Sequence, residues 1–488
     1  MEYRSVLFNS YVFILLFLPL TLSIYFFLNR KKLILASKAW LVLASLFFYG
    51  WWNPVYIPLI LGSILFNYGI GLTLTRAKQS QSRLFLIIGI LGNLILLAYF
   101  KYTDFFINNI NHITGSHIRL LQIALPLGIS FFTFTQIAYL VDVYRRMAKE
   151  YSVLNYFLFV TFFPHLLAGP IIHHKEMMPQ FDRLKNKLLN NKNLVHGLLL
   201  FFVGLFKKVI IADTLAVWVD QGFDHAVILN IVEAWTVSLS YSLQLYFDFS
   251  GYTDMALGSS LMFNIRLPIN FNTPYRSINI QEFWRRWHIT LGRFIRDYVY
   301  IPLGGNRVSE IRIIINLMIT FFIIGLWHGA GWTFVCWGLM HGLAIVVQRT
   351  WKRLNIHLPK PLAWLLTFNF VNFSWIFFRA RNFDDAIKVV KGMFGAHGLG
   401  VTGYINHAFE SFKTFRATLK YWLENIDGNI YTLVFIIICL MLSIYFRNSN
   451  DMEQRFSPTW KNACMLGLLS LYAMLNLQKA SQFIYFIF

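Results

Sequence analysis

The chain has 488 residues, of which 57% are hydrophobic, 18% aromatic and only 13% charged. An average soluble domain has roughly 25% charged residues, so this composition excludes an ordinary soluble protein and indicates an integral membrane protein. The formal net charge of +21 does not indicate nucleic-acid binding, because the Lys and Arg residues form short clusters between apolar segments. Such clusters are typical of cytoplasmic loops and of contacts with anionic lipid head groups.

Cysteine and histidine spacing predicts no metal site. The three cysteines all lie within apolar stretches: Cys336, Cys439 and Cys464. Their spacing fits neither a disulfide framework nor a zinc site. His165, His173 and His174 have no carboxylate at metal-ligand spacing in the sequence, so we expect no metal there either.

Apolar stretches of about 20 residues, long enough to cross a hydrocarbon core, recur from one end of the chain to the other. The candidate spans are 9–28, 34–51, 55–74, 84–100, 119–140, 152–172, 194–212, 229–247, 313–327, 331–348, 361–378, 431–446 and 463–476. They predict roughly eleven to thirteen crossings or partial crossings, with no sizeable part left for a soluble domain.

Basic loops alternate with less basic connections in the first part of the chain, which predicts an external N-terminus. A simple crossing by residues 152–172 would break this alternation, because the basic stretch that follows would then lie outside. Pro164, Gly169 and Pro170 interrupt the segment, so we predict a re-entrant hairpin that returns to the cytoplasmic side. Non-helical backbone at membrane depth requires surrounding protein or a water-filled cavity. A cavity in the middle of the protein is therefore expected.

Residues 273–312 contain seven arginines interleaved with aromatic residues. This composition predicts an amphipathic helix at the cytoplasmic interface. The alternative is a simple membrane anchor with snorkelling side chains. Residues 398–428, which include His407 and Glu410, are expected to form an extramembrane loop with a short helix.

Ionisable residues within apolar spans are costly, so each is a candidate for a functional site. His328 and His341 lie thirteen residues apart in hydrophobic surroundings, and glycines flank both of them. Glycine lets backbone or substrate approach closely, and a desolvated imidazole stays neutral and can accept a proton. Acyl transfer to a hydroxyl requires such a general base. The alternative is a histidine that only forms a hydrogen bond between helices.

A second polar group lies in residues 241–254. Gln244 and Asp248 share one helical face, and so do Ser250 and Asp254 if the helix continues. These side chains either brace neighbouring helices or line a tunnel for the acyl donor, and both interpretations stay open. Asp142 is interpreted as structural.

Several strings occur in a characteristic order along the chain, at residues 126–134, 163–171, 204–213, 244–254, 271–276, 283–289, 327–329, 375–380 and 483–486. Together they resemble the bacterial alginate O-acetylase branch of the membrane-bound O-acyltransferase family. The resemblance implies an all-α polytopic membrane protein, with a ring of about 11–13 transmembrane and re-entrant helices. A cytoplasmic donor tunnel and an external funnel would meet at its centre. It further implies one integral-membrane domain over residues 1–488, with a catalytic core at about 119–380.

The resemblance also implies residue roles. The family's invariant histidine falls on His328, and its second, more cytoplasmic histidine falls on His288, both as catalytic residues. His341 matches a further histidine with a supporting role. Further supporting candidates are Asn272, Gln244 and Asp248.

We therefore expect an O-acetyltransferase in the cytoplasmic (inner) membrane. Acetyl-CoA is expected as the donor substrate, with no bound cofactor, and its phosphates are expected near Arg285, Arg286 and Arg293. The expected acceptor is a hydroxyl of an extracytoplasmic polysaccharide such as alginate, another exopolysaccharide or peptidoglycan. The acetyl group would reach this hydroxyl directly or through an extracytoplasmic acetyltransferase partner protein. Two alternatives stay open: a lipid or protein acceptor, and a transporter or flippase, which internal repeats would favour.

Overall fold

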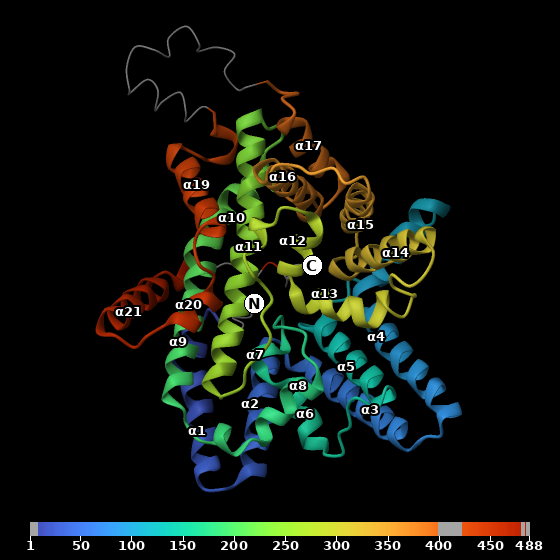
Figure 1. Cartoon of the computed structure of the whole chain (residues 1–488), viewed down its shortest axis with the longest axis vertical. Coiled ribbons are helices and arrows are strands. Elements are labelled where there is room, and N and C mark those ends of the chain that lie inside the picture. Colours follow the sequence, from blue (N-terminus) through green and yellow to red (C-terminus); the bar gives the residue numbers. More distant parts are fainter. Residues whose placement is uncertain (1–7, 399–421, 480–483, 485–488) are drawn as a thin grey trace.

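The computed structural model describes residues 8–398, 422–479 and 484, and within these residues the chain is helical with no β-strand. The first part of the chain contains η1 (Phe13–Phe17), α1 (Leu18–Arg30), α2 (Ile34–Trp52), α3 (Ile57–Arg76), α4 (Gln79–Thr114), α5 (Ile129–Tyr144), α6 (Val153–Thr161), α7 (Phe163–Leu166) and α8 (His174–Asp182). The middle contains α9 (Asn191–Phe206), η4 (Lys207–Ala212), α10 (Asp213–Asp220), η5 (Gln221–His225), α11 (Ile231–Met262), α12 (Ile280–Arg286), α13 (Ile289–Ile295), η7 (Arg296–Tyr300) and α14 (Glu310–His328). The last part contains α15 (Trp332–Arg353), α16 (Lys360–Arg379), α17 (Phe383–Met393), η9 (Glu424–Ile426), α19 (Ile430–Ile444), α20 (Ser449–Arg455) and α21 (Trp460–Leu475) (Figure 1).

Seven helical segments within the described residues are long and apolar enough to cross a membrane. They are Phe13–Arg30, Ile34–Trp52, Pro54–Arg76, Gln79–Thr114, Asn191–His225, Glu310–His328 and Lys360–Arg379. The bent pair of α19 and α20, with axes 57° apart, adds one more candidate. The prediction of an all-α, multi-pass membrane protein is confirmed. The eleven to thirteen crossings expected from the sequence are more than these seven, because they included the segments that form α11 and α15. Both are long helices, but they are more polar than the seven.

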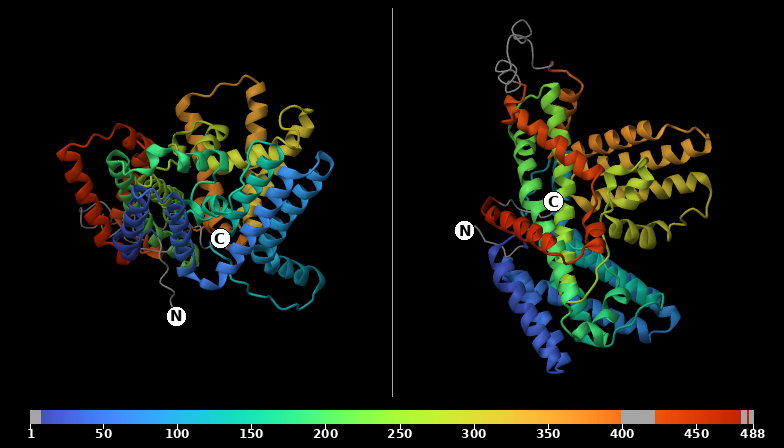
Figure 2. Two further views of the ribbon diagram at one scale, coloured as in Figure 1. Left: turned by 90° about the horizontal axis from the view of Figure 1, so that it is seen from below. Right: turned by 60° about the vertical axis from the view of Figure 1, so that its left-hand side comes forward.

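Helix α11 forms the centre of the fold and runs along the long axis of the molecule (Figure 1). Every residue from Ser240 to Met262 is buried, and the helix packs against α7, α9, α10, α16, α17 and α19. A helix surrounded in this way needs no polar face of its own. Helices α14, α15 and α16 project together from one side of α11 (Figure 2).

Glycines allow α9 and α11 to touch backbone to backbone at two places seven residues apart. A Cβ added to Gly258 would lie 2.5 Å from the carbonyl oxygen of Gly197 and 2.6 Å from the backbone nitrogen of Phe201. A Cβ added to Gly251 would lie 2.7 Å from the carbonyl oxygen of Gly204. Small residues permit this close packing in membranes, where apolar helices gain little by burying surface against each other.

The expected span at residues 119–140 is wrong in its first part. Helix α4 continues to Thr114 and ends at Gly115, which has a φ of +67°. No helix covers residues 115–128, and α5 begins only after Gly128, which has a φ of +71°. Backbone with positive φ cannot continue a right-handed helix, and glycine adopts it readily.

The predicted interruption of residues 152–172 is confirmed. Helix α6 ends at Thr161, and only the four-residue α7 separates it from a non-helical stretch that leads to α8. Pro164 lies in the first turn of α7, where its missing N–H is tolerated.

The single amphipathic helix expected at residues 273–312 is wrong. The chain instead forms two seven-residue helices, α12 and α13, which are separated at His288 by a left-handed conformation with a φ of +43°. Phe283, Trp287 and Phe294 are buried in the protein and do not face lipid. The part of the expected 398–428 loop that contains His407 and Glu410 lies outside the described residues.

The glycine contacts predict a selective loss of stability. Gly258→Ala should lower the free energy of unfolding by about 1–3 kcal/mol, because its Cβ would press on backbone atoms that cannot rotate away. Gly69→Ala in α3 is the matched control, because nothing lies within 4 Å of its added Cβ. Thermal unfolding in detergent, followed by tryptophan fluorescence, measures both. Equal melting temperatures for the two variants would contradict the close-packing argument.

Candidate active site

The structure brings two of the predicted histidines together around one tryptophan. His328 is the last residue of α14, and His288 lies between α12 and α13. The Trp327 ring contacts both, with ring centroids 4.8 Å from His328 and 6.1 Å from His288. The side chains of both histidines are buried, with 4% of His328 and none of His288 exposed.

The position of His328 follows from the close contact of α14 and α15. A Cβ added to Gly338 would lie 3.0 Å from the Cα of Gly325, so the two helices meet where neither residue has a side chain. His328 lies three residues after Gly325, and its ring is 5.1 Å from Trp337 and 5.0 Å from Phe378, both edge to face. Two rigid helices and two large rings therefore limit the motion of this imidazole.

His288 is held by its backbone conformation. Its φ of +43° and ψ of +56° are uncommon for a residue with a side chain. The next two residues are bound to Asn270: the Ile289 N–H donates to its carbonyl at 3.0 Å, and the Thr290 hydroxyl donates to its side-chain oxygen at 2.7 Å. Sparsely populated backbone of this kind is often found at functional sites.

His341 is fixed as a structural partner by hydrogen bonds on both ring nitrogens. The Trp284 indole N–H donates to Nδ1 at 3.2 Å, and Nε2 lies 2.9 Å from the Ser374 hydroxyl. Because Ser374 itself donates to the Val371 carbonyl at 2.8 Å, Nε2 of His341 is the donor in its contact with Ser374. This arrangement assigns one neutral tautomer and leaves no ring nitrogen to accept a substrate proton.

A cavity of about 770 Å³ lies beside the end of α14. Its lining includes the loop residues 329–331, Lys101 of α4, Gln244 of α11 and Arg379 of α16. The side-chain oxygen of Gln244 is buried and has no hydrogen-bond partner within the described part of the chain. Gln244 therefore belongs to the cavity wall.

Asp248 and Asn272, by contrast, make contacts elsewhere. Asp248 forms an ion pair with Lys208 at 2.7 Å, and Lys208 also binds Asp213 at 2.7 Å. Asn272 is exposed and accepts a hydrogen bond from Asn448 at 3.0 Å. Asp248 thus braces α11 against η4 and α10, and Asn272 does not join the buried histidines.

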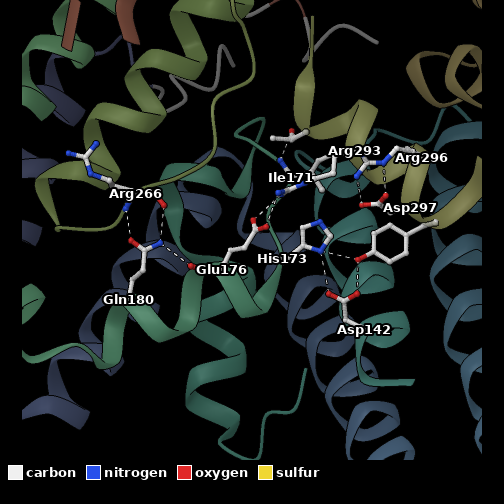
Figure 3. Close-up of polar contacts among 11 residues, drawn as sticks. Asp142, Ile171, His173, Glu176, Gln180, Arg266, Arg293, Arg296 and Asp297 are labelled. Carbon is white, nitrogen blue, oxygen red and sulfur yellow. Dashed lines mark hydrogen bonds and ion pairs between the residues drawn. The ribbon is translucent and has the colours of Figure 1, made fainter. Parts of the chain in front are cut away.

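Two of the three arginines expected to bind donor phosphates are already paired. Arg293 forms two hydrogen bonds with Glu176 of α8, at 2.8 and 3.0 Å (Figure 3). Arg286 pairs with Glu282 one turn earlier at 2.9 Å. Arg285 is exposed and forms no ion pair or hydrogen bond with any described residue. Of the three, Arg285 is the guanidinium open to a ligand.

A polar cluster next to Arg293 joins α5 to the chain after α7. The Tyr298 hydroxyl donates to Asp142 at 2.8 Å, and His173 Nδ1 lies 3.3 Å from the same carboxylate (Figure 3). His174 Nε2 lies 3.2 Å from Glu150. Burial raises the pKa of Glu150, but hydrogen bonds from His174 and a backbone amide outweigh burial and lower it below the usual value. No group of three His, Cys, Asp or Glu residues suited to a metal ion occurs in the described ranges.

Comparison with known proteins identifies the family. The sequence profile of the membrane-bound O-acyltransferase family matches residues 128–383. This chain belongs to that family. It is 47% identical to the peptidoglycan O-acetyltransferase of Helicobacter pylori, over 99% of this chain and 97% of the relative. It is 40% identical to a probable alginate O-acetylase, AlgI, of Pseudomonas aeruginosa, over 79% and 74%, and 30% identical to the teichoic acid D-alanyltransferase of Streptococcus thermophilus, over 52% and 68%.

Membership of the membrane-bound O-acyltransferase family confirms the resemblance drawn from the sequence strings and makes the protein a membrane acyltransferase. Lys101 is a part of the site that the sequence did not indicate. The candidate span ended at residue 100, which placed this lysine at the membrane surface, where a cation needs no explanation. In the structure α4 extends beyond it, and its ammonium reaches the end of α14.

Proposed function

We propose that this protein moves an acetyl group from acetyl-CoA in the cytoplasm to a hydroxyl of an extracytoplasmic glycan, with peptidoglycan as the first candidate acceptor. The observation that carries the proposal is the placement of the buried His328 at the end of α14, immediately before residues 329–331, which line the cavity. Extensive similarity to a peptidoglycan O-acetyltransferase supports the acceptor. The protein would lie in the cytoplasmic membrane, which separates cytoplasmic acetyl-CoA from the extracytoplasmic glycan.

Charge distribution along the helices supports an external cavity. Helix α4 begins after the basic residues Arg76 and Lys78, and Lys101 lies about 33 Å further along the helix axis. Helix α14 begins near Arg307 and Arg312, and His328 lies about 27 Å from its start. These lengths match a hydrocarbon core of about 30 Å. Since basic ends stay in the cytoplasm, the cavity would face the other compartment.

Acetyl transfer at this site requires one base and one oxyanion donor. As the acceptor oxygen attacks the thioester carbonyl carbon, His328 takes the hydroxyl proton. The indole N–H of Trp337 is buried without a hydrogen-bond partner within the described residues, and its ring lies beside His328, so it can donate to the oxyanion together with His288. The carbon–sulfur bond then breaks, and His328 returns the proton to the leaving thiolate.

The charges of the cavity favour a glycan without a carboxylate on every sugar. Its wall contains three carboxylates and three basic groups: Asp104, Asp220, Asp224, Lys101, Arg379 and Arg381. Arg379 is paired with Asp224 at 2.7 Å and with Asp220 at 2.9 Å, so its charge is already balanced. A polyuronate such as alginate would be better matched by unpaired basic groups, which makes alginate the second candidate. The hydroxyl belongs to the glycan or to an extracytoplasmic partner protein that passes the acetyl group onward.

Arg285 provides a test of donor binding. Arg285→Gln should raise the KM for acetyl-CoA about two- to fivefold, because one exposed ion contact is worth up to about 1 kcal/mol. The kcat should change little, since a phosphate contact remote from the thioester holds the ground state and the transition state equally. Arg296→Gln, an exposed arginine paired with Asp297, is the matched control. An unchanged KM in Arg285→Gln, measured in membranes normalised for protein, would remove this role.

His328 provides a test of the chemistry. His328→Ala should lower turnover by about 10²-fold or more, because the general base is lost. His165→Gln is the matched control: His165 is equally buried, at 4% exposed, but its Nε2 faces the Phe159 carbonyl at 3.0 Å. Acetyl transfer per folded protein should persist in His165→Gln. More than about a tenth of wild-type turnover in His328→Ala would contradict the assignment.

A further inference from the structure

Lys101 is a charged residue at the far end of the apolar stretch of α4, directly after residue 100. Between Arg83 and Asp104, α4 contains no other charged side chain, and the helix is among the seven apolar segments long enough to span a membrane. The side chain of Lys101 is half-buried, so its ammonium needs hydrogen-bond partners within the protein.

The partner is the end of the helix that presents His328. Lys101 Nζ donates to the carbonyl oxygen of Trp327 at 2.6 Å and to that of His328 at 3.0 Å. The next residue on α4, Tyr102, donates its hydroxyl to the carbonyl of Leu326 at 2.7 Å. Three successive carbonyls at the end of α14 are therefore bound by one neighbouring helix.

These contacts satisfy carbonyl groups that a helix end leaves without hydrogen-bond partners. The last four carbonyls of a helix have no partner within the helix and carry a partial negative charge. Without outside donors the last turn is free to unwind, and here the last residue is His328 itself. A cation at this end is favoured electrostatically as well as by its hydrogen bonds.

Lys101 also lines the cavity, together with residues 329–331, which directly follow His328. An ammonium has three N–H donors, and the two carbonyls account for two of them. The same group thus lies at the boundary between the helix end and the space proposed for the acceptor.

We propose that Lys101 is a positioning residue for His328, holding the last turn of α14 so that the imidazole meets the acceptor hydroxyl in a reactive geometry. This inference rests on the proposed role of His328 as the base. A displacement of about 1 Å at a reacting group can cost about 10²-fold in rate, so the effect of losing the ammonium should be large.

The first test compares two neighbouring side chains that bind the same helix end. Lys101→Met keeps the length of the side chain and removes its donors, and water in the cavity can replace them at the carbonyls. It should lower kcat about tenfold to 10²-fold with the KM for acetyl-CoA nearly unchanged. Tyr102→Phe removes one hydrogen bond, at the carbonyl of Leu326, and leaves the carbonyls of Trp327 and His328 bound by Lys101, so it should lower kcat less than Lys101→Met does. Release of CoA with solubilised peptidoglycan strands as acceptor, per monodisperse protein, gives both constants.

The second test separates hydrogen bonding from charge and does not depend on one variant. In Lys101→Ala, methylammonium should restore activity, because it can reach the carbonyls through the cavity and donate hydrogen bonds. Tetramethylammonium carries the same charge without an N–H group and should not. Equal effects of the two cations, or a kcat in Lys101→Met equal to that in Tyr102→Phe, would overturn the proposal.

The proposal and the proposed function can fail separately. If His328→Ala retains activity, the base is misassigned whatever Lys101 does. If His328→Ala is inactive and Lys101→Met is fully active, only the positioning role of Lys101 is overturned.

Discussion

The site depends on the backbone contact between α14 and α15. Gly325 and Gly338 let these helices approach until side chains would collide, and this distance puts the rings of His328 and Trp337 5.1 Å apart. At the other end of the hairpin, Arg349 of α15 binds Glu310 of α14 at 2.9 Å. The imidazole of His328 therefore belongs to one helix and packs against the other, and the two helices are in contact at both ends. Its depth in the membrane follows from the length of α14.

Polar groups within the bundle divide into two kinds with different consequences. Lys207 binds Asp254 at 2.7 Å, and Lys208 lies between Asp213 and Asp248, so each of these charged groups has a partner of opposite charge and the pairs fasten η4 to α11. An ion pair of this kind is hard to break, because either partner alone would be a buried charge. Gln244, one helical turn from Asp248, lacks such a partner within the described residues and faces the cavity. The contrast separates structural polar residues from those available to a substrate.

Sequence reasoning predicted the helical membrane fold and selected both histidines that the structure brings together, because glycine-flanked histidines in apolar segments and the ordered strings are local features. It failed where distant segments decide the outcome. The basic, aromatic stretch at 273–312 has the composition of an interfacial helix, yet Arg293 pairs with Glu176, 117 residues away, and the aromatic rings are buried. Lys101 was overlooked because its partners, the carbonyls that end α14, lie more than 220 residues later and leave no local signal.

The central claim is that donor and acceptor meet at His328 from opposite sides of the membrane. Proteoliposomes with a defined protein orientation test this claim most directly, with peptidoglycan strands trapped inside and acetyl-CoA labelled in its acetyl group added outside. For protein whose cytoplasmic loops face outward, labelled acetyl esters should appear on the trapped glycan while CoA stays outside. Labelling only when both substrates are on the same side, or equal labelling in vesicles containing His328→Ala, would contradict the account.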